Sequence, residues 1–128
     1  MTAKPGKRAK VLIVSLPGMM QNVLRESIIR RQDVEVVGVV GGCLSATAML
    51  PQAQPDLVVI DSNLPEADVV ELILHLKRLP TPITSLMLVE TTQQYHKAAS
   101  AGADHAIRSY SLPDGLDPVL DQLKTNHK

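Results

Sequence analysis

The sequence has few aromatic residues and a single cysteine. Its 128 residues include two tyrosines, Tyr95 and Tyr110, and neither phenylalanine nor tryptophan. Cys43 stands alone, which excludes an intramolecular disulfide and a cysteine-cluster metal site. No apolar run is long enough to span a membrane, and no signal-peptide pattern opens the chain. We therefore expect a cytoplasmic protein with no membrane partner.

The charges of the chain cancel, with 13 Lys or Arg side chains against 13 Asp or Glu side chains. A neutral chain has no overall attraction to nucleic acid, so we expect none as a partner of this domain. Four basic side chains nevertheless cluster near the start: Lys4, Lys7, Arg8 and Lys10. Because this cluster is short and lacks aromatic residues, we interpret residues 1–9 as a solvent-exposed basic arm. Residues 10–126 then form one domain.

Apolar runs typical of strands alternate with stretches of helical periodicity. The predicted strands are residues 11–15, 34–40, 57–61, 83–89 and 105–107. Apolar residues at helical spacing predict helices around residues 20–28, 44–54, 69–76, 95–101 and 116–123. We expect Pro51 to shorten or kink the second helix and Gly102 to end the fourth. Strands this apolar need cover on both faces, which predicts an α/β protein with a parallel five-stranded sheet.

The carboxyl ends of the predicted strands carry the candidate functional residues. These ends are Ser15-Leu16, Gly41-Gly42, Asp61, Glu90-Thr91 and Arg108-Ser109. Open α/β sheets bind their ligands beyond such ends, at the point where the strand order reverses. If the order is 2-1-3-4-5, the reversal lies between the first and third strands, which places Asp61 there. A carboxylate in that position can act as a nucleophile.

Four stretches and one short pattern point to a known family. The stretches are KVLIV (10–14), DVEVVGVVGG (33–42), PDLVVIDSNLP (55–65) and AGADHAI (101–107), and the pattern is D-x-N-x-P, which runs from Asp61 through Asn63 to Pro65. On these residues, and over nearly its whole length, the chain resembles the receiver domain of bacterial two-component response regulators, with D-x-N-x-P the strongest match. The resemblance implies a flavodoxin-like, doubly wound (βα)5 fold and a role in phosphorelay signal transduction. It implies that Asp61 is the phosphoacceptor for a histidine kinase or phosphotransfer protein. It also implies that Asp61 and the backbone carbonyl of Asn63 are ligands of Mg²⁺.

The metal-binding residues of the family are largely missing. Receivers carry an acidic pair at the end of the first strand, and the pair position here reads Ser15-Leu16. Hard cations need oxygen ligands, usually with one or two carboxylates, and leucine offers none. We therefore expect Mg²⁺ binding, if it occurs, to be weak. The family's lysine after the fifth strand is replaced by Ser109, counted from Gly102 without gaps, or by Arg108 if one residue is deleted.

The residues that switch a receiver between its two states also differ. The switch hydroxyl at the end of the fourth strand corresponds to Thr91 or is replaced by Glu90, and the aromatic switch residue of the fifth strand is Ala106. Receivers signal through the face made by the fourth helix, fifth strand and fifth helix. By resemblance that face here carries Tyr95 and Tyr110, which we predict to contact a protein partner or a second copy.

Three functions remain open on the sequence alone. The first is an atypical receiver that is still phosphorylated at Asp61. The second is a pseudo-receiver, which serves as a protein-interaction module without phosphoryl chemistry. The third and remotest is a small-molecule-binding flavodoxin-like module. None of the three is an enzyme in its own right, and the chain is either a stand-alone regulator or a part of a longer one.

Several candidate residues also have a plain structural interpretation. Asp61 can simply accept backbone N–H groups of the turn that follows its strand. Cys43 is expected to be a small buried hydrophobic residue rather than a redox sensor. The four histidines, at positions 75, 96, 105 and 127, lack the spacing of metal ligands and have no evident nucleophile to serve as a base.

Overall fold

A computed structural model describes residues 8–126 of the chain, with side chains as far as Leu123. Five strands alternate with five α-helices: β1 (Ala9–Val14), α1 (Met19–Ile29), β2 (Val34–Val40), α2 (Cys43–Ala53), β3 (Leu57–Asp61), α3 (Glu66–Arg78), β4 (Thr84–Val89), α4 (Thr92–Ala101), β5 (His105–Arg108) and α5 (Asp117–Asn126). Two short 3₁₀ turns, Ser109–Ser111 and Asp114–Leu116, connect β5 to α5. The basic arm predicted at the start of the chain falls mainly on residues 1–7, which lie outside the described residues.

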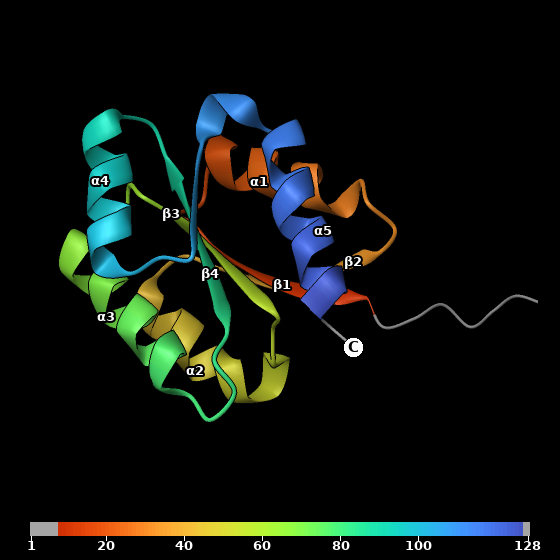
Figure 1. Ribbon diagram of the computed structural model, residues 1–128, viewed down its shortest axis with the longest axis horizontal. Coiled ribbons are helices and arrows are strands. Elements are labelled where there is room, and N and C mark those ends of the chain that lie inside the picture. Colours follow the sequence, from red (N-terminus) through yellow and green to blue (C-terminus); the bar gives the residue numbers. More distant parts are fainter. Residues whose placement is uncertain (1–7, 127–128) are drawn as a thin grey trace, which may run out of the picture.

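All strand pairs are parallel, and the sheet order is β2-β1-β3-β4-β5. Helices α2, α3 and α4 cover one face, and α1 and α5 cover the other (Figure 1). The α/β class, the flavodoxin-like topology and the strand order predicted from the sequence are confirmed. No helix within residues 8–126 is long and apolar enough to cross a lipid bilayer.

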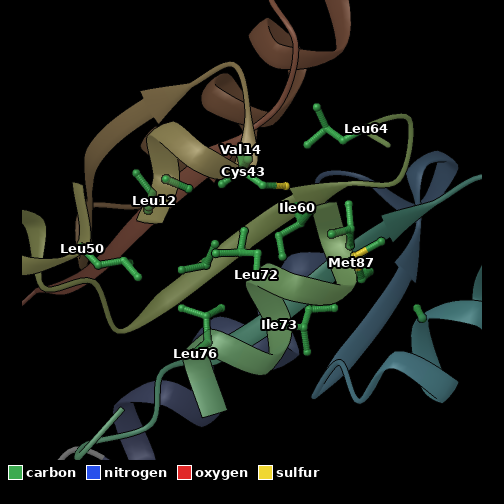
Figure 2. Close-up of a cluster of buried hydrophobic side chains, with 14 of the residues drawn as sticks. Leu12, Val14, Cys43, Leu50, Ile60, Leu64, Leu72, Ile73, Leu76 and Met87 are labelled. Atoms are coloured by element: carbon green, nitrogen blue, oxygen red, sulfur yellow. The ribbon is translucent and has the colours of Figure 1, made fainter. Parts of the chain in front are cut away.

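The sheet is buried on both faces because its three central strands are apolar at successive positions. Every residue of β3 is buried, including Asp61 at its end. One core cluster lies between the sheet and helices α2, α3 and α4, and Figure 2 shows several of its side chains: Leu12, Val14, Ile60, Leu72, Ile73 and Met87. A second cluster lies between the sheet and helices α1 and α5, and it includes Leu24, Ile28, Leu116 and Leu120.

Local sequence signals explain where several elements begin and end. Gly102 adopts a left-handed conformation (φ 94°) after α4, as expected of a helix-ending glycine. Helix α4 begins at Thr92, earlier than the periodicity alone indicated, because the Thr91 side chain accepts the N–H of Gln94 and caps the helix. Pro51 did not shorten α2, which continues two residues further to Ala53.

Gly38 in β2 permits close packing against α2. A Cβ atom at this position would lie 2.7 Å from the sulfur of Met49 and 3.0 Å from a methyl carbon of Leu12. The register between β1 and β2 shifts beside it, between Val11 and Leu12. The missing side chain therefore lets an irregular edge strand remain packed under its helix.

Candidate functional site

The carboxyl ends of the parallel strands meet at one edge of the sheet. Strand β1 lies between β2 and β3, so the chain leaves β1 toward one side and later returns to form β3 on the other. This is the reversal point at which ligands of open α/β sheets bind. Asp61 closes β3 at this edge, beside Ser15, which follows β1. The structure therefore brings these two residues together at the reversal where the sequence analysis placed Asp61.

Both carboxylate oxygens of Asp61 accept hydrogen bonds from uncharged donors. The Ser15 hydroxyl donates to Oδ2 over 3.1 Å, and the backbone N–H of Asn63 donates to Oδ1 over 3.0 Å. The Asp61 side chain is buried, with 5% of the residue exposed, and Ser15 is fully buried. Among the side chains that the structure describes, no Lys, Arg or His forms an ion pair with Asp61. Within the described residues, Asp61 is thus a buried acidic residue whose hydrogen-bond donors are uncharged.

The bond from Asn63 also closes the turn after β3. The N–H of Asn63 lies two residues beyond Asp61, which is the spacing of an Asx turn, and the N–H of Leu64 donates to the Asp61 carbonyl over 3.3 Å. Leu64 is buried in the core cluster on the α3 side of the sheet. The structural role predicted for Asp61, accepting backbone N–H groups of its turn, is therefore present.

The donor set around Asp61 does not fit a firm Mg²⁺ site. Leu16 stands where a second carboxylate is needed, and half of it (51%) is exposed to solvent. Glu90, the remaining acidic candidate at this edge, is exposed. No group of three or more His, Cys, Asp or Glu side chains within the described residues can hold a metal ion. The site offers Mg²⁺ a single carboxylate and, by resemblance, one backbone carbonyl, so the remaining ligands would have to be water or substrate oxygens.

The end of β4 is organised by a residue that the sequence reading missed. The Gln94 side chain accepts the Glu90 N–H over 2.7 Å and the Ser62 hydroxyl over 3.1 Å. It thereby joins the loop before α4 to the residue directly after Asp61. Thr91 is occupied as the helix cap. The T-x-x-Q spacing of Thr91 and Gln94 is a capping-box signal, and it was the available sequence clue to this arrangement.

Arg108 and Ser109, the two candidates for the lysine position, lie at the end of β5. The Arg108 guanidinium donates to the Thr92 hydroxyl over 3.1 Å and lies 5.9 Å from the centre of the Tyr95 ring. Ser109 begins the 3₁₀ turn that follows the strand. Arg108 therefore contacts the first turn of α4 and the exposed aromatic ring beside it.

The two tyrosines are exposed, as an interface role requires. Tyr110 is 81% exposed in the turn after β5, and Tyr95 is 43% exposed on α4. The Tyr95 ring also meets the His96 ring edge-on, at a centroid distance of 6.2 Å. The apolar residues of the last helical stripe, by contrast, are buried against the sheet. Tyrosines, rather than the stripe of α5, are the apolar groups available to a partner on this face.

Comparisons with known proteins agree on one family. A family model described as "Response regulator receiver domain" matches residues 11–110. Among curated proteins, the chain is similar to a protein-glutamate methylesterase/protein-glutamine glutaminase of Ralstonia nicotianae, with 27% identity over 91% of this chain and 32% of that protein. It is 31% identical to one from Syntrophomonas wolfei over 86% of this chain and 32% of that protein. The chain thus matches about a third of the length of these relatives.

Solved structures show the same fold at low sequence identity. The non-phosphorylated receiver domain of the stress response regulator RcsB from Escherichia coli has a TM-score of 0.79 and 18% identity, covering 95% of this chain and 97% of that one. The response regulator domain of Thermotoga maritima CheB has a TM-score of 0.67 and 24% identity, covering 93% and 96%. The arrangement of strands and helices around Asp61 is therefore shared with solved receiver domains.

Proposed function

The chain belongs to the response regulator receiver domain family, and from that premise we propose that it is an atypical receiver in phosphorelay signal transduction. In this proposal Asp61 is the phosphoacceptor position, and a histidine kinase or phosphotransfer protein is the donor. The placement of Asp61 at the carboxyl edge of β3, at the reversal of the strand order, supports this role. The D-x-N-x-P pattern that begins at Asp61 supports it from the sequence.

The hydrogen bond from Ser15 to Asp61 is the observation that supports an atypical receiver. To accept a phosphoryl group, one carboxylate oxygen must attack phosphorus, so it must first give up its bond to Ser15 or to Asn63. Phosphoryl transfer is catalysed mainly by positioning and by neutralising charge on the transferred group. The uncharged donors at Asp61 neutralise little of the charge on a phosphoryl group. Arg108, the basic candidate for the lysine position, already contacts Thr92 and Tyr95. We therefore expect slow transfer to Asp61.

A second candidate is a pseudo-receiver that binds partners without being phosphorylated. The same two hydrogen bonds favour it, because they give Asp61 a sufficient structural role in the turn after β3. In this version the output lies on the surface of α4 and the segment after β5, where Tyr95 and Tyr110 are exposed. Its partner is another protein or a second copy of the chain.

Beryllofluoride, a phosphoryl mimic, distinguishes the two candidates when it is added with Mg²⁺ and followed by NMR. A phospho-receiver should show saturable amide shifts at Asp61, Ser62 and Asn63 that the Asp61→Asn variant loses. Asp114→Asn, a change at an exposed aspartate outside the site, is the matched control. Mass spectrometry after incubation with acetyl phosphate reports covalent transfer directly. Absence of both signals would reject the phosphoacceptor role and leave the pseudo-receiver.

The relatives also suggest what kind of protein this domain would serve. The curated relatives named above are designated methylesterases and glutaminases, and the chain matches about a third of their length. We propose that the chain contributes regulation and no catalysis of its own. A methylesterase assay with the chain alone should therefore give no activity above buffer.

A further inference from the structure

A cavity of about 160 Å³ lies between α3 and α4, next to the turn that follows Asp61. Its walls are aliphatic: Val69, Val70 and Ile73 come from α3, Ala98 and Ala101 from α4, and Met87 from β4. An apolar cavity of this size, on the order of 150 Å³, is large enough to hold benzene. The cavity is therefore a candidate site for a small organic molecule.

The composition of the chain explains why this space is unfilled. Helix α4 presents Ala98 and Ala101 to α3, and no phenylalanine or tryptophan exists anywhere in the chain to reach across. In Figure 2, Ile73 and Met87 lie on the side of the core cluster away from Leu12 and Leu50. The two helices stand side by side on the same face of the sheet in Figure 1. Small side chains on one helix and branched ones on the other leave an apolar gap.

Four polar residues also line the cavity, and two of them, Lys97 and Glu66, are largely exposed to solvent. The Ser62 hydroxyl donates to the Gln94 side chain over 3.1 Å, and the Lys97 ammonium contacts the Glu66 carboxylate at 3.2 Å. The side chains of Lys97 and Glu66 are 50% and 66% exposed. An ion pair this exposed contributes little free energy, so a carboxylate from solution can replace Glu66 at Lys97 at low cost.

We propose that this cavity binds a small organic acid with a compact apolar body. The ring or branched hydrocarbon occupies the space between α3 and α4, and the carboxylate pairs with Lys97. Apolar walls with a few polar groups at one end are typical of small-molecule sites. The proposal does not depend on phosphorylation of Asp61, because none of the groups that line the cavity has a role in phosphoryl transfer.

Benzoate and benzyl alcohol are suitable probes, since they share the ring and differ in charge. When either probe is titrated into the protein, NMR should show saturable shifts of the methyl groups of Val69, Val70, Ile73 and Met87. Lys97→Gln should weaken benzoate binding by about threefold to fivefold and leave benzyl alcohol within about twofold. Glu66→Gln should strengthen benzoate binding, because it removes the competing carboxylate. Lys77→Gln, an exposed lysine near the other end of α3, is the matched control and should change neither affinity.

Filling the cavity tests its location. Ala98→Leu should fill the cavity and abolish binding of both probes. If this variant fails to fold, Ala101→Leu, at a half-buried position nearer the surface, is the substitute and should have the same effect. The proposal is overturned if neither probe gives saturable shifts at the cavity methyl groups. It is also overturned if a folded, cavity-filled variant still binds benzoate with unchanged affinity, or if Lys97→Gln and Glu66→Gln change benzoate binding in the same direction.

Discussion

Ser15, directly after β1, and Asp61, at the end of β3, lie 46 residues apart in the chain, and the Ser15 hydroxyl donates a 3.1 Å hydrogen bond to the Asp61 carboxylate. Both residues are buried, with 5% of Asp61 and none of Ser15 exposed to solvent. The bond gives Oδ2 of Asp61 a hydrogen-bond partner, whereas many buried carboxylates have a metal ion or a cationic side chain as the partner of such an oxygen. Under the proposed function, this contact stabilises Asp61 and must be broken before that oxygen can attack phosphorus.

Removing this donor should destabilise the fold. Ser15→Ala leaves one oxygen of a buried carboxylate without its protein partner, so the free energy of unfolding should fall by about 1–3 kcal/mol. Urea unfolding followed by circular dichroism measures this. Ser45→Ala, at an exposed position in α2, is the control and should have almost no effect. An equal stability of Ser15→Ala and the original protein would mean that the bond contributes nothing.

Magnesium affinity should depend on the pair of residues after β1. We expect weak or undetectable Mg²⁺ binding by the unmodified chain, and a clear increase when Ser15 and Leu16 are both replaced by aspartate, because each change adds a hard ligand. Isothermal calorimetry measures both affinities. Tight binding by the unmodified chain would contradict the prediction, and a further test with Glu90→Gln would then show whether that exposed carboxylate takes part.

Association through the face of α4 and β5 should depend on Tyr110 more than on Asp61. An 81% exposed tyrosine can bury a large apolar ring in an interface, so Tyr110→Ala should weaken self-association or partner binding by about tenfold. Asp61→Ala should have little effect. Leu44→Ala, at an 86% exposed leucine at the start of α2, is the control. Analytical ultracentrifugation measures self-association; loss of binding in Asp61→Ala but not in Tyr110→Ala would restore a phosphorylation switch.

An ion-pair cluster around Arg31 should make stability depend on pH. Asp117, at the start of α5, accepts bonds from Arg30 at 2.7 Å and Arg31 at 3.1 Å. Burial acts to raise the pKa of Asp117, but the bonds from Arg31 and Arg30 outweigh it and hold the pKa below its ordinary value of 3.8. A carboxylate with a lowered pKa stabilises the fold above its unfolded-state pKa, and this stabilisation is lost as the pH falls through the folded-state value.

The test measures the free energy of unfolding of Asp117→Asn and of the original chain at a series of pH values. The difference in free energy of unfolding should be constant above roughly pH 5 and should shrink as the pH falls below 3.8. Asp114→Asn, which alters a carboxylate outside the cluster, is the control. A stability difference for Asp117→Asn that does not change with pH would show that its charge is unimportant.

Cys43 should react slowly with thiol reagents while the protein is folded. Burial, together with the nearby carboxylate of Asp68, raises the pKa of the thiol to about 11. At pH 8 the thiol is therefore protonated, and the thiolate is the reactive form. A disulfide reagent should label Cys43 far more slowly in buffer than in urea. Equal rates would show that the cysteine is reached without unfolding.

The sequence by itself determined the framework of this protein. Continuous, β-branched apolar runs such as residues 57–60 favour buried strands, and the helical spacing between them places helices on both faces of a parallel sheet. These patterns are local and repeat along the chain, so the strands and helices could be predicted from them. The strand order, and with it the place of Asp61 at the reversal, came from the resemblance to receiver domains. Boundaries were less exact: the beginning of α4 depends on the Thr91 side chain, and α2 continues past Pro51.

Only the tertiary structure decided which groups surround Asp61. The Ser15 hydroxyl reaches it because β1 and β3 are neighbours, and Gln94 reaches Ser62 because α4 begins beside the turn after β3. Such contacts join residues far apart in the chain and depend on side-chain orientation, which no periodicity encodes. The cavity beside Ala98 has the same origin, since it arises from the volumes of side chains on two helices that the fold packs together.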